Sequence, residues 1–377
     1  MRILFVSSWT PKKAPAYESR IINIEKHCKK LGADTSRLFL WKLFFGSPVL
    51  IQPLNIPFVL RSLRQFDVII AEGNGSAYVL ALTKALLRNN TLLIYDMHND
   101  ALAESCLFGK GRFNIEGYFR GFNARLTEYL GFNGFYYFAV ASLGLKRNLL
   151  ERKPCIKDEN VEVILNGVDL ELFGSKNQTT TNSLEHPFIV AYSGSYAEYQ
   201  GIENVVKAAE ILHNKDIHFK FMGFREEDLA IKTNIKNRLK EKVTCLDWLP
   251  KDELISELQK SDVLISPSGQ CAGHSGRAVF PTKFGEFLAL AKPVIVTNID
   301  ETSSIVERFD CGFICKPTAE SFAETILNAK ESPKDVLRMK GYNGRRFAEA
   351  ELDIKLICKK YLEFLEKLLK ERFSKSQ

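Results

Sequence analysis

Two series of short apolar runs alternate with stretches of helical spacing, and this rhythm constrains the fold more than any other feature of the chain. In the first series, apolar runs predict strands over residues 3–6, 66–71, 91–96, 137–142 and 161–165. Apolar residues at helical spacing predict helices over 21–31 and 77–87. Short apolar strands that alternate with helices specify a mostly parallel sheet covered on both faces.

The alternation then stops and starts again. Residues 174–183 form a polar tract without any apolar side chain, which is typical of a linker between domains. After it, the second series predicts strands and helices over 188–192, 202–212, 218–222, 252–259, 263–265, 283–290 and 293–297. We therefore predict two α/β domains, residues 1–183 and 184–354. Ligands of open α/β sheets bind beyond the carboxyl ends of the strands, so we expect a site in a cleft between the domains.

Length and composition support two folded domains. A chain of 377 residues is too long for one ordinary core, and 45% apolar with 26% charged residues disfavours disorder, collagen, coiled coils and multi-span membrane proteins. The net charge of +7 is weaker than that of a dedicated nucleic-acid binder, so we expect no nucleic-acid partner. The first residues do not read as a secretory leader, and the most apolar later stretch, 135–145, is too short for a bilayer. We expect a cytoplasmic protein whose eight cysteines, which contain no CxxC pair, are reduced.

Two common phosphate-binding signatures are missing. No G-x-G-x-x-G follows a predicted strand, and G-x-x-x-x-G-K-[ST] does not occur. Dinucleotide oxidoreduction and P-loop hydrolysis therefore lose their main support, and the candidates that remain lie at the ends of predicted strands.

The most informative candidate is the predicted helix start around Pro281, Thr282, Lys283 and Glu286. The first turn of a helix presents N–H groups that favour a phosphate. Lys283 and Glu286 are three residues apart and share a face, so the lysine could pair with a diphosphate and the carboxylate could accept hydrogen bonds from both ribose hydroxyls. The same pair is equally typical of a surface ion pair favoured by the helix dipole.

A second candidate follows the first strand of the second domain. Ser193 and Ser195 can donate hydrogen bonds to phosphate oxygens, and Gly194 allows the backbone to approach a ligand. An ordinary strand-to-helix turn explains the same residues.

In the first domain, His98 comes directly after a predicted strand. At that position it could bond a sugar hydroxyl or a developing charge, although a lone histidine is more often structural. Asn166-Gly167 ends a later strand and is a strong turn signal that needs no ligand to explain it.

Taken together in chain order, these segments resemble the GT-B glycosyltransferases, and most closely the retaining family 4. Leu165-Asn166-Gly167-Val168-Asp169 with Phe173 is similar to the family's P-N-G-V-D-x-x-x-F signature. Asp96-Met97-His98 with Glu104-Ser105 resembles its Y-D-x-H-D-x-x-P-E-S segment. The stretch 281–295 resembles its E-A-M-A-x-G-x-P-V-I helix, and Ser266-Pro267-Ser268 resembles its P-S loop. The resemblance implies two Rossmann-like domains that face a cleft, with the final helix, 355–377, crossing back to the N-terminal domain.

The resemblance also implies roles for single residues. Glu286 would bind the ribose of a nucleotide sugar, and His98 would contact the donor sugar as the catalytic histidine. Ser193, Gly194 and Lys283 would lie against the diphosphate, and Trp248 and Leu249 fall where the family seats the base.

Two departures from the family pattern affect the donor site. Gln200 stands where the family has a lysine, and Ser195 stands near its arginine position. Lys283 or Arg277 would have to replace that grip on the diphosphate, and we favour Lys283. The family's earlier glutamate falls on Ala278.

The reaction implied is transfer of a hexosyl group from a nucleoside diphosphate sugar to a hydroxyl of a glycan or lipid-linked acceptor, with retention of configuration. No D-x-D motif is present, so we expect no metal and no cofactor beyond the substrate. Basic and aromatic residues are interleaved over 105–153, which suits an anionic membrane surface and equally suits an ordinary basic face. A GT-B epimerase or phosphorylase, or a catalytically weak nucleotide-sugar-binding module, are the alternatives.

Overall fold

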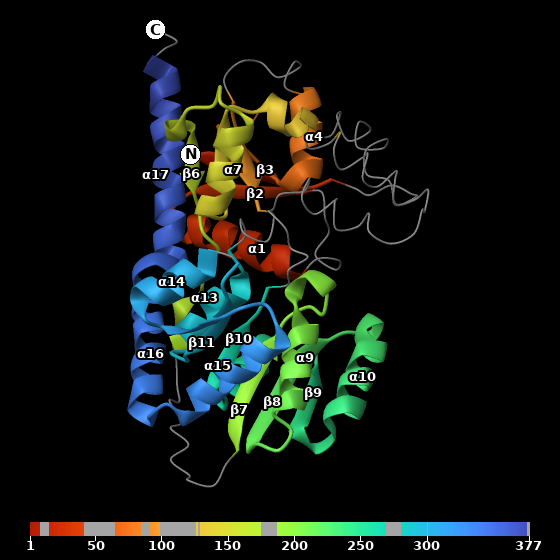
Figure 1. The fold of residues 1–377 in the computed structure, drawn as a ribbon. Helices are drawn as coiled ribbons and strands as arrows, with labels where there is room; N and C mark the ends of the chain where they lie inside the picture. Colours follow the sequence, from red (N-terminus) through yellow and green to blue (C-terminus); the bar gives the residue numbers. More distant parts are fainter. Residues whose placement is uncertain are drawn as a thin grey trace. The chain divides into compact units, whose positions relative to one another are not determined.

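The computed structural model describes residues 1–7, 15–40, 65–83, 91–98, 126, 129–174, 187–268, 280–299 and 301–374. The chain divides into two compact units. The first unit comprises Met1–Gly167 with Ile354–Gln377, and the second comprises Val168–Asp353 (Figure 1).

A six-stranded sheet in which every pairing is parallel forms the centre of the first unit, in the order β2-β1-β3-β4-β5-β6. Its strands are β1 (Arg2–Ser7), β2 (Asp34–Phe39), β3 (Val68–Glu72), β4 (Leu92–Met97), β5 (Tyr137–Val140) and β6 (Val161–Val163). Strand β2 is the one that the sequence did not predict, because Asp34-Thr35-Ser36-Arg37 lacks an apolar run. Among the described strands it pairs with β1 alone, so it lies at an edge of the described sheet, where a polar strand is tolerated.

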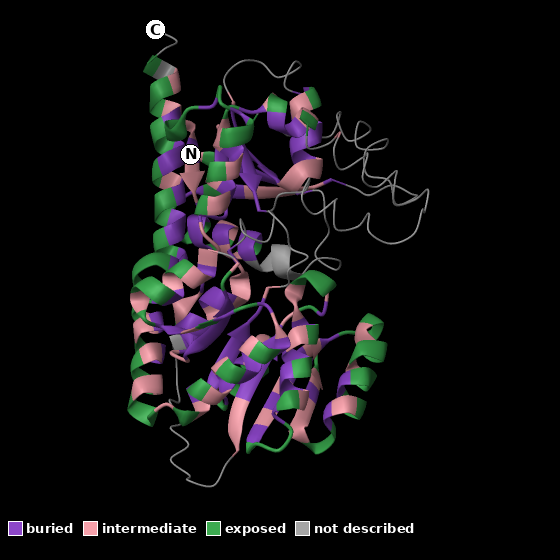
Figure 2. Cartoon of the chain, viewed as in Figure 1, coloured by how far each residue is buried: buried purple, intermediate pink, exposed green. Residues whose placement is uncertain are grey.

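Helices cover both faces of this sheet. They are α1 (Pro15–Lys30), α4 (Gly73–Thr83), α7 (Leu143–Arg152), the 3₁₀ turn η4 (Asp158–Asn160) and α17 (Ile354–Ser374). Helix α17 buries a stripe at helical spacing against α1 and the sheet, formed by Ile354, Ile357, Cys358, Tyr361, Phe364, Leu365 and Leu368. Figure 2 shows this stripe as buried segments alternating with exposed ones along the helix. The C-terminal helix therefore returns to the N-terminal unit, as predicted.

The second unit contains another six-stranded sheet in which every pairing is parallel, in the order β12-β11-β10-β7-β8-β9. Its strands are β7 (Phe188–Ser193), β8 (Ile217–Phe224), β9 (Val243–Asp247), β10 (Val263–Ser266), β11 (Val294–Thr297) and β12 (Gly312–Cys315). Strands β10 and β11 are buried along their whole length, which explains why they read as continuous apolar runs.

Two groups of helices pack on this second sheet. Its helical segments are α8 (Leu170–Gly174), η5 (Glu198–Gln200), α9 (Ile202–Ile211), η6 (Glu226–Asp228), α10 (Leu229–Leu239), η7 (Lys240–Lys242), α11 (Lys251–Gln259), α13 (Thr282–Ala289), α14 (Glu301–Phe309), α15 (Ala319–Glu331), α16 (Lys334–Phe347) and the π-helical turn η9 (Ala348–Leu352). Helices α9, α10 and α15 share one buried cluster with the sheet. Helix α13 contacts β10 and β11 and also packs against α8 and α16.

The division between the units falls between Gly167 and Val168, ahead of the predicted boundary at 183/184. Val168 already belongs to the second unit because its N–H donates to the Leu352 carbonyl at 2.7 Å and it pairs with Asp353. Gly167 remains in the first unit, where a Cβ atom would lie 2.5 Å from the Ile354 side chain. The polar tract that the sequence marks as a linker lies outside the described residues, apart from Gly174.

Candidate functional site

Two of the predicted donor stretches meet in the second unit. Ser193 ends strand β7 and Gly194 follows it, while Lys283 lies in the first turn of α13. The Lys283 Nζ atom would be 3.4 Å from a Cβ atom built on Gly194. The sequence placed these residues on one ligand, and the structure places them side by side.

Gly194 allows this close approach. Its φ of +144° is rarely adopted by residues with a side chain, and a Cβ atom there would lie 3.0 Å from the Tyr192 hydroxyl oxygen. Gly223, on the neighbouring strand, has a φ of +98°, and its Cβ atom would lie 3.0 Å from the Gly194 carbonyl oxygen. Two facing glycines therefore allow the backbone, Tyr192 and Lys283 to pack closely at this turn, while Ser195 beyond it is exposed.

Aromatic and amide groups position the ammonium of Lys283. Its Nζ atom lies 4.5 Å from the ring centroid of Tyr192 and donates to the Tyr192 hydroxyl at 3.2 Å. It also donates to Oε1 of Gln200. Burial raises the pKa of Tyr192 well above its ordinary value of 10, so the phenol stays neutral and donates its proton to the Ser195 carbonyl at 2.5 Å. Gln200 stands where the family pattern has a lysine, and here it accepts a hydrogen bond from Lys283.

Glu286 lies on the next turn of α13 with 15% of its side chain exposed. Its Oε1 atom accepts a hydrogen bond from Nζ of Lys251, the first residue of α11, at 2.5 Å. The Lys251 ammonium also lies 4.9 Å from the ring centroid of Phe173. Lys251 could not be identified from the sequence, because a single lysine at a helix start gives no sign of a distant partner.

The remaining donor residues are placed less specifically. Trp248 has 61% of its surface exposed, and its N–H donates to the Phe224 carbonyl at 2.9 Å, which fixes the backbone just after β9. Leu249 and Thr282 are half-buried, and Arg277 lies outside the described residues. Since Lys251 follows Trp248 by three residues, the predicted base segment is connected to Glu286 through that lysine.

In the first unit, His98 lies at the carboxyl end of β4, where the sequence placed it. The side chain is buried, with Nδ1 at 3.5 Å from Oδ1 of Asp96. Burial lowers the pKa of His98 to about 4, although the Asp96 carboxylate acts in the opposite direction and Arg20 adds to the lowering. At neutral pH the imidazole is therefore uncharged, which suits a hydrogen bond to a sugar hydroxyl better than an ion pair with phosphate.

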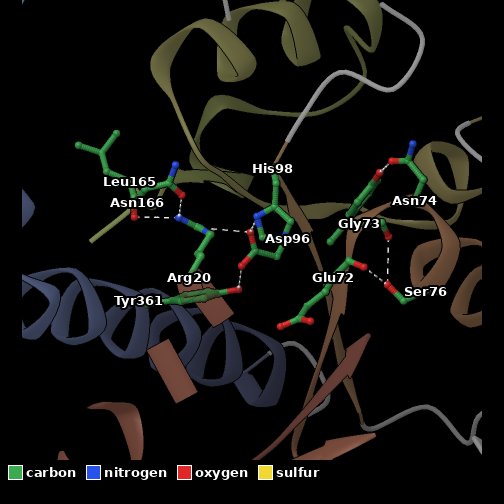
Figure 3. Close-up of polar contacts among 11 residues, drawn as sticks. Arg20, Glu72, Gly73, Asn74, Ser76, Asp96, His98, Leu165, Asn166 and Tyr361 are labelled. Atoms are coloured by element: carbon green, nitrogen blue, oxygen red, sulfur yellow. Dashed lines mark hydrogen bonds and ion pairs between the residues drawn. The ribbon is translucent and has the colours of Figure 1, made fainter. Parts of the chain in front are cut away.

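A buried network holds Asp96 in place (Figure 3). Arg20 from α1 lies 3.3 Å from Oδ1 of Asp96, and it also donates to the Leu165 carbonyl at 2.8 Å and to Oδ1 of Asn166 at 2.9 Å. Tyr361 from α17 donates to Oδ2 of Asp96 at 3.4 Å. Asn166, which the sequence explained as a turn signal, thus accepts a hydrogen bond from Arg20 in this network. Neither Arg20 nor Tyr361 was predicted from the sequence as a member of the site.

Glu72 is a further buried carboxyl at the same edge of the first sheet. The strand registers place it between Ser7 of β1 and Asp96 of β4. Burial raises the pKa of Glu72 well above its ordinary value of 4.5, and the Asp96 carboxylate adds to the rise. Figure 3 shows Glu72 and His98 on neighbouring strands, so the carboxyl ends of β3 and β4 together carry the ionisable groups Glu72, Asp96 and His98.

The described ranges contain neither a candidate membrane span nor a candidate metal site. None of the described helices has the length and the apolar composition needed to cross a membrane. Nor does the described part of the chain gather three or more His, Cys, Asp or Glu side chains in a metal-binding arrangement.

The family comparison concerns the second unit. Residues 175–347 match the family model described as "Glycosyl transferases group 1". This match agrees with the glycosyltransferase family that the resemblance implied.

Two curated relatives match part of the chain. The Escherichia coli (strain K12) protein WcaI, provisionally named a colanic acid biosynthesis glycosyl transferase, is 23% identical over 216 residues, which are 55% of this chain and 47% of WcaI. The Bacillus subtilis (strain 168) protein TuaH, provisionally named a teichuronic acid biosynthesis glycosyltransferase, is 27% identical over 159 residues, 41% of this chain and 39% of TuaH. The matched region thus spans less than half the length of either relative.

A solved structure extends the comparison of the fold to nearly the whole chain. The crystal structure of Anabaena Alr3699/HepE in complex with UDP and glucose has a TM-score of 0.73 and 16% identity, covering 97% of this chain and 100% of that one. The predicted fold class, α/β with two Rossmann-like domains of the GT-B kind, is confirmed. The cleft that the sequence predicted between the domains stays a prediction.

Proposed function

We propose that this protein is a retaining glycosyltransferase that moves a hexosyl group from a nucleoside diphosphate sugar to a hydroxyl of a glycan or lipid-linked acceptor. The group 1 domain supports glycosyl transfer. The names of WcaI and TuaH support a role in the synthesis of a cell-surface polysaccharide, and the HepE complex with UDP and glucose supports a nucleotide-sugar donor.

The observation that carries the proposal is the arrangement of charges on α13. Lys283 and Glu286 are half-buried, three residues apart, and each is positioned by groups from other elements. In this proposal Glu286 accepts hydrogen bonds from the ribose hydroxyls, and Lys283 pairs with the diphosphate. The diphosphate lies at the Gly194 turn, beside Lys283 and the Ser193 and Ser195 groups.

The same residues supply the electrostatic part of catalysis. As the bond from the anomeric carbon to the diphosphate breaks, negative charge grows on the leaving oxygen, and the ammonium of Lys283 stabilises that charge. The acceptor oxygen bonds to the anomeric carbon on the same face, and its proton passes to the departing diphosphate. His98, uncharged at neutral pH, contributes a hydrogen bond to the donor sugar.

We also propose that the protein works at the cytoplasmic face of an anionic membrane. The support is the mixture of basic and aromatic residues over 105–153, much of which lies outside the described residues. Sedimentation with anionic liposomes at low salt tests this point, and absence of binding would discard it.

The donor site is tested by a thermal-shift panel of UDP, GDP and ADP. A nucleotide at 100 times its Kd should stabilise the folded protein by about 2.7 kcal/mol. Glu286→Ala should abolish the largest shift. The control is Glu257→Ala. Glu257 lies on α11 and its carboxylate accepts hydrogen bonds from Lys220 and Lys260, not from Lys251, so this variant should keep the shift. An unchanged shift in Glu286→Ala would refute the ribose assignment.

A further inference from the structure

Lys251 occupies an unusual position for a lysine. It is the first residue of α11, and Asp252 and Glu253 follow it in the same turn. A cation at a helix N-terminus opposes the helix dipole, which favours acidic side chains there. The Glu286 carboxylate on α13 offsets the charge of this lysine at 2.5 Å.

The lysine is confined on a second side by an aromatic ring. The Phe173 centroid lies 4.9 Å from Nζ, and Phe173 itself is buried with 5% exposure. Arg345 of α16 donates to the Ala289 carbonyl at the end of α13 at 2.7 Å, and its contact with the Phe173 carbonyl is 3.5 Å. Arg345 thus connects Phe173, whose ring lies against Lys251, to the helix that carries Glu286.

The contact engages one oxygen of the carboxylate. Lys251 donates to Oε1, and each carboxylate oxygen can accept more than one hydrogen bond. The hydrogen bond to Oε1 restricts rotation of the carboxylate and so limits the directions in which Oε2 can point. A carboxylate that is fixed before binding loses less conformational entropy when it accepts hydrogen bonds from a ligand.

We propose that Lys251 is a positioning residue that orients Glu286 for the ribose hydroxyls of the nucleotide. This inference rests on the proposed function, because it assumes that Glu286 contacts ribose. Lys251 acts through the carboxylate and is not assigned a contact with the nucleotide. Its removal should weaken recognition of the 2′-hydroxyl more than recognition of the rest of the nucleotide.

The experiment compares each of UDP, GDP and ADP with its 2′-deoxy counterpart by titration calorimetry on the full chain. The wild type should prefer the ribose form of the nucleotide that binds best. Lys251→Met keeps an unbranched side chain of similar length and removes the ammonium, so we expect about a tenfold loss of that preference, comparable to one hydrogen bond of a charged group. Lys260→Met, at the other end of α11, breaks an exposed pair with Glu257 and should leave the preference unchanged.

A double variant separates an orienting role from a direct contact. If Lys251 acts through Glu286, Lys251→Met should add no further loss of affinity to Glu286→Ala. An added loss would show that Lys251 touches the nucleotide itself and would overturn this inference while leaving the proposed function intact. A preference that Lys251→Met leaves unchanged, or increases, would also overturn it. If the wild type binds none of the three nucleotides, the proposed function fails and the inference fails with it.

Discussion

The two units each gather ionisable groups near the carboxyl ends of their strands, but the two clusters differ in burial. In the first unit, the side chains of Arg20, Asp96 and His98 are 3%, 1% and 7% exposed. In the second unit, Glu286 is 15% and Lys251 39% exposed. Buried charges must be paired or hydrogen-bonded by other protein groups. Partly exposed charges are accessible, so a ligand can replace one of their protein partners.

The difference indicates different uses. Arg20 connects α1, β4 and the segment after β6, so the first cluster holds elements of the first unit together around His98. The second cluster connects α13 to the turn after β7 and to α11 through lysines that lie against aromatic rings. We therefore expect substitutions in the first cluster to reduce stability and substitutions in the second to reduce ligand affinity.

The largest effect expected is on stability, from Arg20→Ala. Removing one partner of a buried ion pair leaves an uncompensated charge and costs about 3–5 kcal/mol. The matched control is Arg2→Ala, which removes an exposed pair with Asp67 on the same sheet and should cost about 0–1 kcal/mol. Urea denaturation of both variants tests the comparison, and equal midpoints would show that the Arg20 network is not a stabilising feature.

The next effect concerns the dependence of stability on pH. The pKa of His98 is lowered to about 4 in the folded protein, so between about pH 6.5 and pH 4 the unfolded chain binds a proton there that the folded chain does not. Folding stability should therefore fall as the pH falls through this window, by about 3 kcal/mol in total from this group. Below it, both states are protonated and the effect ends.

His98→Asn should remove this contribution and flatten the pH dependence. Unfolding free energies at pH 7, 6, 5 and 4 measure it. The exposed His213→Asn serves as the control and should retain the wild-type slope. A His98→Asn slope equal to the wild-type slope would show that the imidazole is not held uncharged by burial.

The smallest effect expected is on affinity, from Lys283→Met. Hydrogen bonds to charged groups contribute about 1.5–3 kcal/mol, so affinity for the preferred nucleoside diphosphate should fall about 10- to 100-fold while affinity for the nucleoside alone stays the same. Lys340→Met is the control, because Lys340 also lies against an aromatic ring, Phe313, and contacts a side-chain oxygen, that of Asp310, and neither partner belongs to α13. Equal losses for nucleoside and diphosphate would place Lys283 outside the phosphate site.

Much of the fold could be predicted from the sequence because buried parallel strands are continuous apolar runs. Helix α13 was predicted over 283–290 and is observed over Thr282–Ala289. Strand β2 was missed because it is polar and lies at the sheet edge. The boundary near Gly167 could not be predicted, since it depends on the pairing of Val168 with Asp353, far away in the sequence.

The candidate site was predictable only where the residues belong to a motif. Lys283, Glu286 and His98 each follow a strand or begin a helix, so local pattern identifies them. Their partners come from distant segments: Lys251 from α11 for Glu286, and Arg20 from α1 for Asp96. Such pairs depend on the tertiary fold, and contacts between distant residues could not be predicted from the local patterns of one sequence.

The most direct test of the account is a crystal structure of the protein with the nucleoside diphosphate that gives the largest thermal shift. The account predicts the ribose hydroxyls within hydrogen-bond distance of the Glu286 carboxylate, with the diphosphate beside Lys283 and the turn at Gly194. A nucleotide bound elsewhere, with Glu286 and Lys283 still engaged only with Lys251, Tyr192 and Gln200, would contradict it.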